Sequence, residues 1–146
     1  MTDRPSTSVE LSWQGGYKFS SSDTHGHSVT VDAPMNDGDD FEGMMPGGLL
    51  LTSLAGCSGI DVVNILRRQR QNVTSLEISV VGYQQPDPPW TYENVELRYV
   101  VRGTGLRESL VERAVKLSEE KYCSVGATLS GRCEITSTYE IVEDGA

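Results

Sequence analysis

Three cysteines are the side chains of this sequence with the clearest capacity for chemistry. They are Cys57, Cys123 and Cys133, and no two of them have the Cys-x-x-Cys spacing of zinc sites or thioredoxin-like motifs. A deprotonated thiol is a strong nucleophile and can be oxidised reversibly, so these residues could support redox chemistry. The alternative is that they are inert, because free cysteine is among the most frequently buried residue types.

Cys57 lies in the middle of a segment with helical periodicity. Leu50, Leu54, Cys57 and Asp61 share one face and apolar residues fill most of the rest, which predicts a buried helix from Gly48 to about Gln71. The neighbours of the cysteine are small, and its two nearby glycines each cost a helix roughly 1 kcal/mol. Small neighbours let a substrate or another backbone approach the sulfur, although tight packing around an inert cysteine would need them too.

Cys123 lies where two predicted helices meet, one from about Leu106 to Lys121 and one from Tyr122 to Leu129. A thiol at the start of a helix and beside a lysine is expected to have a lowered pKa. The alternative interpretation is a small apolar residue at a helix junction. Cys133 begins the last predicted strand, and we interpret it as structural.

Other groups that could hold a metal are incomplete. His25 and His27 flank a glycine, but no third and fourth ligand is evident near them. An acidic loop lacks the regular pattern of a calcium site, so it is expected to be solvated (Asp37, Asp39, Asp40 and Glu42). No glycine-rich phosphate-binding loop is present. We therefore expect neither a metal nor a cofactor.

Composition limits the classes of partner. The chain has 146 residues, which predicts one domain spanning residues 1–146. Its 12 basic and 21 acidic residues give a formal net charge of -9, which disfavours binding to nucleic acid. It has no continuous apolar run of roughly eighteen residues and no secretion signal at the N-terminus, so we expect a cytoplasmic protein that is not in a membrane.

Short strands are predicted on both sides of the central helix. Apolar and polar residues alternate in three segments before it, two after it and one at the end of the chain. The predicted order is therefore βββ-α-ββ-αα-β, an α+β fold without a βαβ repeat. The strands are expected at Val9–Trp13, Tyr17–Ser21, Val29–Val31, Leu76–Tyr83, Glu93–Arg102 and Ile135–Ile141.

Two motifs resemble those of one family. The stretch from Pro46 to Val63, with the sequence PGGLLLTSLAGCSGIDVV, is similar to the central-helix signature of OsmC/Ohr proteins, the osmotically inducible and organic hydroperoxide resistance proteins. The stretch LSEEKYCSV, from Leu117 to Val125, resembles their second-cysteine motif, and the turn at His27 and the strand end at Asp32 also fit. The resemblance is closest to the YhfA-like branch of the family.

The resemblance implies an activity and an assembly. OsmC/Ohr proteins are intertwined homodimers of α+β fold, whose sheets wrap around two central helices and whose active sites lie at the subunit interface. By this match, Cys57 attacks the O–O bond of a hydroperoxide and becomes a sulfenic acid, and Cys123 condenses with it to a disulfide. A dithiol reductant, of lipoyl type in the Ohr branch, would restore the thiols.

The sequence departs from the family pattern at the residues that activate the thiolate. Gly48 stands where the family usually has a glutamate, and no arginine lies between Arg4 and Arg67, so Lys18 is the nearest cation in the matching region. Asp61, one turn after the first cysteine, is expected to raise the thiol pKa if its charge faces the sulfur.

Two functions follow from this departure. One is a peroxidase that is slower than proteins with the full signature, with Trp90 and Tyr92 at the rim of its pocket. The other is a non-catalytic binding or stress protein that keeps the fold and an interface pocket.

Overall fold

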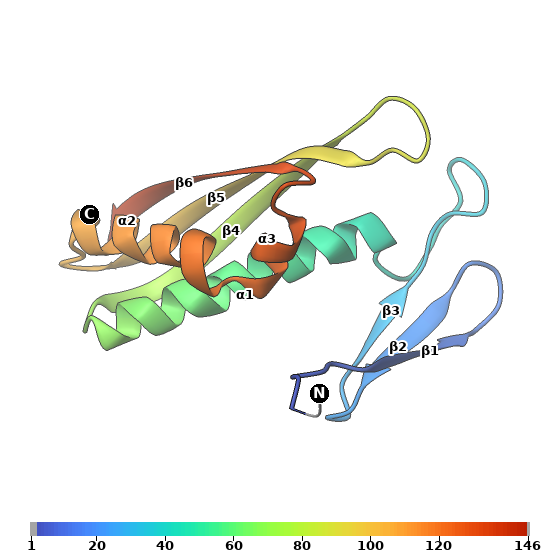
Figure 1. The fold of residues 1–146 in the computed structure, drawn as a ribbon, viewed down its shortest axis with the longest axis horizontal. Coiled ribbons are helices and arrows are strands. Elements are labelled where there is room, and N and C mark those ends of the chain that lie inside the picture. Colours follow the sequence, from blue (N-terminus) through green and yellow to red (C-terminus); the bar gives the residue numbers. More distant parts are fainter. Residues whose placement is uncertain (1–2, 146) are drawn as a thin grey trace. The chain divides into compact units, whose positions relative to one another are not determined.

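The N-terminal part of the chain forms a small antiparallel sheet. The computed structural model describes residues 3–145 and divides into two units, with the boundary between Leu50 and Leu51. In the first unit, strands β1 (Val9–Trp13), β2 (Phe19–Asp23) and β3 (Ser28–Val31) pair in sequence order (Figure 1). The prediction of a single domain stays a prediction.

The second strand begins later than the sequence predicts. Gly15 and Gly16 both have positive φ, and the turn closes when the Lys18 N–H donates to the Gly15 carbonyl at 3.0 Å. Tyr17 therefore belongs to the turn, and β2 starts at Phe19, opposite Trp13. The turn residues that favour positive φ set this register.

Apolar side chains of this small sheet are left uncovered by the described chain. Val9, Leu11 and Trp13 are 58%, 53% and 68% exposed, and they alternate along β1, so they lie on one face. An apolar sheet face of this kind usually packs against another layer.

The long helix α1 (Pro46–Arg68) carries the first cysteine. Its buried stripe contains Leu54, Ser58, Val62 and Leu66, which recur every four residues. The helix starts two residues earlier than predicted, because proline is well suited to a first helical position. It ends earlier as well, since Arg70 adopts a positive φ of 55° just before the next strand.

Helix α1 is only partly covered within one chain. It is long and apolar enough to cross a membrane by length and composition, but the core helix of a soluble protein meets the same test. The absence of a membrane segment therefore stays a prediction. Within residues 3–145, only 22% of its most apolar stretch is buried.

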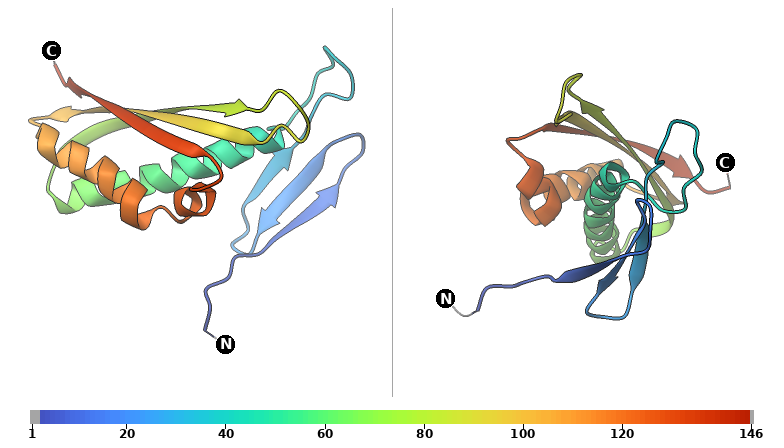
Figure 2. Two further views of the ribbon diagram at one scale, coloured as in Figure 1. Left: turned by 45° about the horizontal axis from the view of Figure 1, so that its top comes forward. Right: turned by 90° about the vertical axis from the view of Figure 1, so that its right-hand side faces the viewer.

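A three-stranded sheet forms the other layer of the second unit. Its order is β4 (Asn72–Gln84), β5 (Tyr92–Thr104) and β6 (Glu134–Glu143), with β4 antiparallel and β6 parallel to β5. The central strand β5 buries Val95, Leu97, Tyr99 and Val101 at alternate positions. Helices α1 and α2 lie on the same face of this sheet (Figures 1 and 2).

The connection between β5 and β6 brings the second cysteine to α1. Parallel neighbours need a crossover, and here it consists of α2 (Glu108–Leu117), the π-helix η1 (Ser118–Tyr122) and α3 (Ser124–Leu129). The sequence predicts one regular helix to Lys121, but the last turn widens, and the Cys123 N–H donates to the Ser118 carbonyl at 2.8 Å. The predicted α+β class and the order of the strands and α-helices are confirmed.

Candidate active site

Cys57 and Cys123 are neighbours in space. Their Sγ atoms and a carboxylate oxygen of Asp61 all lie within 4.8 Å of one another. Cys57 is half-buried on α1, and Cys123 is buried at the junction between η1 and α3. Because 65 residues separate Cys123 from the adjacent Ser58, the fold and not local geometry makes this pair.

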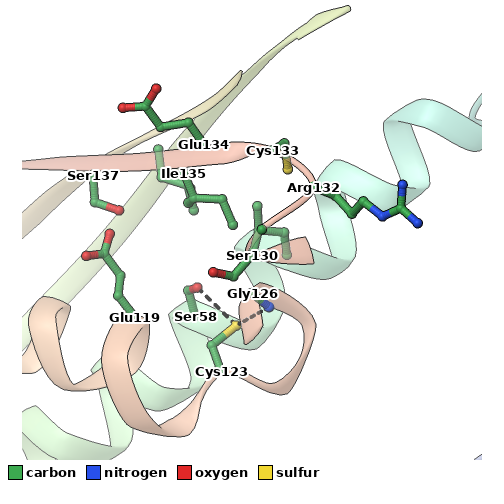
Figure 3. A pocket seen from close by; sticks show the side chains of 13 residues that line it. Ser58, Glu119, Cys123, Gly126, Ser130, Arg132, Cys133, Glu134, Ile135 and Ser137 are labelled. Carbon is green, nitrogen blue, oxygen red and sulfur yellow. Dashed lines mark hydrogen bonds between the residues drawn. The ribbon is translucent and has the colours of Figure 1, made fainter. Parts of the chain in front are cut away.

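Cys123 occupies the N-cap position of α3. Its Sγ accepts hydrogen bonds from the Gly126 N–H at 3.2 Å and from the Ser58 hydroxyl at 3.4 Å (Figure 3). Glycine suits position 126, because a Cβ there would lie 3.2 Å from the sulfur and 3.5 Å from a methyl of Leu54. The cysteine thus replaces the usual side-chain oxygen of a helix cap.

Burial raises the pKa of Cys123, and the donors Ser58 and Gly126 offset this only in part. The prediction that the helix start and Lys121 would lower the pKa of this thiol is therefore wrong. The physical reason is desolvation, because the side chain is 3% exposed and a thiolate there loses its water. The ammonium of Lys121 instead lies 5.4 Å from the centre of the Tyr122 ring.

The N-terminus of α3 acts on Cys57. Burial is the largest single influence and raises its pKa. The Val125 N–H, the Cys123 thiol and the hydroxyl and N–H of Ser124 together outweigh it, so the pKa of Cys57 lies below that of an ordinary cysteine. The Ser124 hydroxyl lies 3.9 Å from the sulfur. Backbone donors at a helix start stabilise a thiolate, so Cys57 is the more acidic thiol of the pair.

Asp61 faces the thiol pair. One carboxylate oxygen accepts a hydrogen bond from the Ser118 hydroxyl at 3.2 Å. Ser118 is fully buried. The expectation that the Asp61 charge raises the pKa of Cys57 stays a prediction, because the lowered pKa of this thiol is the joint result of burial and the hydrogen-bond donors around it.

The acidity of Cys57 can be tested with a proline at the first position of α3. Ser124→Pro removes both the N–H and the hydroxyl, and Cys123 already has the extended backbone that precedes proline, with φ -76° and ψ 102°. We expect the pKa of Cys57 to rise, measured by the pH dependence of its alkylation by iodoacetamide. Ser124→Ala, which keeps the N–H, should raise it less. An unchanged alkylation profile in Ser124→Pro would contradict this account.

A cavity of about 510 Å³ opens beside Cys123. Its walls contain the apolar side chains of Leu54 and Leu97. Ile135 and Cys133 also line it (Figure 3). The thiol of Cys133 donates to the Leu129 carbonyl at 3.7 Å, and the structural role of this residue stays a prediction. Cys57 is not among the lining residues, so the cavity reaches the pair from the Cys123 side.

Two thiols and a carboxylate are donors that a soft cation such as Zn²⁺ accepts, but three ligands fall one short of a closed structural zinc site. His27 bonds instead to Asp23 at 2.9 Å, and both of the chain's histidines are exposed. The expectation of no metal and no cofactor stays a prediction.

Other predicted site residues have different partners. The Lys18 ammonium donates to Glu42 at 2.8 Å, and this hydrogen bond raises the pKa of the lysine. Trp90 is exposed, and the ring of Tyr92 packs over Gly82, where a Cβ would come within 2.6 Å of it. Neither Trp90 nor Tyr92 lines the cavity beside Cys123, so their place at a pocket rim stays a prediction.

Sequence reasoning missed the residues that support the two thiols. Ser58 lies on the otherwise apolar buried face of α1, and Ser118 follows the apolar buried face of α2. A polar residue in such a pattern is a signal for a buried hydrogen bond. The N–H groups of Ser124 and Val125 leave no such signal, because every residue except proline has one.

Comparison with known proteins identifies the family. A sequence model of the OsmC-like proteins matches residues 36–138. Protein YhfA of Escherichia coli K12 is 36% identical over 134 residues, which cover 92% of this chain and 97% of YhfA.

Solved structures agree with this match. A hypothetical protein from Aquifex aeolicus is 34% identical, with a TM-score of 0.79, over 96% of this chain and all of the other. The organic hydroperoxide resistance protein OhrB of Bacillus subtilis, 16% identical with a TM-score of 0.64 over 92% of this chain and 98% of its own, shares the fold. The chain belongs to the OsmC-like protein family.

Proposed function

We propose that this chain is a thiol-dependent peroxidase that reduces organic hydroperoxides, with Cys57 as the peroxidatic residue and Cys123 as the resolving residue. The observation that carries the proposal is the pair itself, two thiols within 4.8 Å of each other. Only one of them has a lowered pKa. A peroxidase of this type needs such a difference in pKa, because one sulfur must attack the peroxide as a thiolate while the other is still protonated.

In the first step the Cys57 thiolate attacks one oxygen of the hydroperoxide. The O–O bond breaks, the alkoxide leaves and takes up a proton to become the alcohol, and the sulfur becomes a sulfenic acid. In the second step the Cys123 sulfur attacks the Cys57 sulfur. The S–O bond breaks, the hydroxide leaves with the Cys123 proton as water, and a disulfide forms. The Sγ atoms of the two residues lie within 4.8 Å of each other, which favours formation of this bond.

The N-terminus of α3 supplies the thiolate stabilisation that Gly48 and the absent arginine do not. The Val125 and Ser124 N–H groups favour the Cys57 thiolate directly. Lys18, the alternative cation, is already paired with Glu42. Fixed backbone donors stabilise an anion with less strength than a charged guanidinium, so we expect slower oxidation than in proteins with the full signature.

We further propose a homodimer in which a second copy covers the exposed side of α1. Next to Cys57, position 56 is open, because a Cβ on Gly56 would meet nothing within 4 Å. Ile60 follows one turn later and is 73% exposed. An apolar partner surface over these residues would create a pocket through which a peroxide reaches the Cys57 sulfur.

The choice between peroxides tests this function. We expect the second-order rate of Cys57 oxidation by cumene hydroperoxide to exceed that by hydrogen peroxide by about tenfold or more, since burial of one or two apolar groups accounts for a factor of this size. The measurement is competitive oxidation of the reduced protein, with the sulfenic acid and disulfide quantified by mass spectrometry. Equal or faster oxidation by hydrogen peroxide would contradict the preference. Failure of both peroxides to oxidise any thiol would contradict the peroxidase function.

A further inference from the structure

The carboxylate of Asp61 takes no part in the proposed peroxidase reaction, although it lies beside both sulfurs. The Sγ atoms of Cys57 and Cys123 and one oxygen of Asp61 all lie within 4.8 Å of one another. A tetrahedral Zn²⁺ ion, at about 2.3 Å from each thiolate, holds two sulfurs about 3.8 Å apart. The three atoms are therefore close enough for a single ion to contact all of them.

Hydrogen-bond donors orient two of these three side chains. The Sγ of Cys123 accepts bonds from the Gly126 N–H at 3.2 Å and from the Ser58 hydroxyl at 3.4 Å (Figure 3). The Asp61 carboxylate accepts one from the Ser118 hydroxyl at 3.2 Å. Both serines are buried, so their hydroxyls are fixed in position. Donors of this kind orient the ligands of metal sites, and here they come from the protein before any ion binds.

A cation from solvent can reach Asp61 through a second cavity. Residues of α1, α2 and η1 form this cavity of about 430 Å³, and its lining includes Asp61 and the exposed Arg68 and Arg113. Within residues 3–145 Asp61 forms no ion pair, so its charge is available to a cation. Two thiolates and a carboxylate leave a small excess of negative charge around a divalent ion, and the two arginines offset part of it.

We propose that Cys57, Cys123 and Asp61 of the reduced protein bind Zn²⁺ as an exchangeable ion that blocks oxidation of Cys57. Thiolates and a carboxylate are ligands that Zn²⁺ accepts, and three protein ligands leave the fourth position to water. Each thiol releases its proton to solvent when the ion binds, and no electrons are transferred. Metal binding does not depend on the proposed function, whereas inhibition of peroxide reduction rests on it.

The ion and the disulfide exclude each other. In the zinc form, the lone pair with which the Cys57 thiolate would attack the O–O bond is donated to the ion. In the oxidised form, two of the three protein ligands are joined to each other and no longer bind as thiolates. The ion is therefore a reversible inhibitor of the reduced protein and not a resident cofactor.

Titration of the reduced, metal-free protein with Co²⁺ tests the site. Co²⁺ occupies tetrahedral zinc sites, and its thiolate charge-transfer and d–d absorption bands report the ligands and their geometry. We expect a single ion per chain with thiolate charge transfer, displaced by Zn²⁺, and no binding after oxidation with diamide. A spectrum without thiolate charge transfer, or equal binding by the oxidised protein, would overturn the site.

Asp61→Asn tests the carboxylate ligand, because it keeps both thiols. We expect its affinity for Zn²⁺ to fall about a hundredfold or more, since loss of a residue that only orients a ligand already costs about 10–100-fold. The matched control Glu120→Gln removes a negative charge at an exposed position of η1 and should keep the affinity within about threefold. If Asp61→Asn does not fold, Ser118→Ala should weaken binding about tenfold through the lost hydrogen bond. Wild-type affinity in Asp61→Asn would overturn the assignment of Asp61.

Protection of Cys57 from iodoacetamide separates this inference from the peroxidase function. At free Zn²⁺ of about ten times the dissociation constant, alkylation should slow about tenfold, because only the unbound fraction reacts, and EDTA should restore the rate. Oxidation by cumene hydroperoxide should slow to the same degree. If peroxide oxidises no thiol but Zn²⁺ protects Cys57 from alkylation, only the peroxidase function fails. Undiminished alkylation or oxidation at saturating Zn²⁺ would overturn the inference.

Discussion

Cys57→Ser is expected to reduce peroxide consumption to the uncatalysed background. A serine hydroxyl is not ionised at neutral pH and therefore cannot attack an O–O bond as an anion. The N–H groups at the start of α3, which stabilise the Cys57 thiolate, do not change this. The measurement is the loss of cumene hydroperoxide with dihydrolipoamide as the reductant. Residual turnover in Cys57→Ser would show that another thiol performs the first step.

Cys123→Ser is expected to fail one step later. Cys57 should still react with the first equivalent of peroxide, but Cys133 is not part of the group that Cys57 forms with Asp61 and Cys123, so we expect no thiol to condense with the sulfenic acid. Mass spectrometry should therefore show a sulfenic acid followed by sulfinic and sulfonic acids. The matched control is Cys133→Ser, which should keep wild-type turnover, since its thiol donates to a backbone carbonyl at 3.7 Å. A disulfide mapped to Cys133 would refute the assignment of roles.

The order of the elements was accessible from the sequence because its signals are local. Alternation in the strands and a long apolar helix around Cys57 depend on residues close together in the chain. The predicted ends of helices and strands were less accurate where the φ angle of a single residue sets the boundary. The turn at Gly15 and Gly16 makes β2 start later than predicted, and the positive φ of Arg70 makes α1 end earlier than predicted. The widened turn at Ser118 depends on the crossover that returns the chain to α1, a tertiary contact that helical propensity does not contain.

The proximity of Cys57 and Cys123 was also predictable, but the pKa shifts of their thiols were not. The start of α3 was predicted two residues too early, at Tyr122 instead of Ser124, and its N–H groups favour the thiolate of Cys57, which comes from another helix. Which thiol a helix terminus stabilises depends on the direction in which its N–H groups point and on the burial of each sulfur. The local sequence predicts neither of these. The same holds for Asp61, because its approach to the Cys123 sulfur and its hydrogen bond from Ser118 arise only when α1 packs against η1 and the start of α3.

Ile60→Glu is expected to convert the proposed dimer into monomers. Gly56, Ile60 and Val63 follow one another at helical spacing along the exposed side of α1. The open space at Gly56 would let a second helix approach closely. A carboxylate buried without a partner costs several kcal/mol, and a twofold interface would bury two of them. Since each 1.4 kcal/mol is a factor of ten, the dissociation constant should rise on the order of a thousandfold or more.

The measurement is light scattering coupled to size-exclusion chromatography across a concentration series, with peroxide oxidation followed on the same samples. Ser79→Glu adds the same charge at an exposed position of β4, and we expect it to leave the mass unchanged. If Ile60 also borders the route to Cys57, the monomeric variant should lose its preference for cumene hydroperoxide. Its thiols should still form a disulfide with diamide, because both sulfurs belong to one chain. A wild-type monomer at micromolar concentration, or an unchanged dimer in Ile60→Glu, would refute the interface along α1.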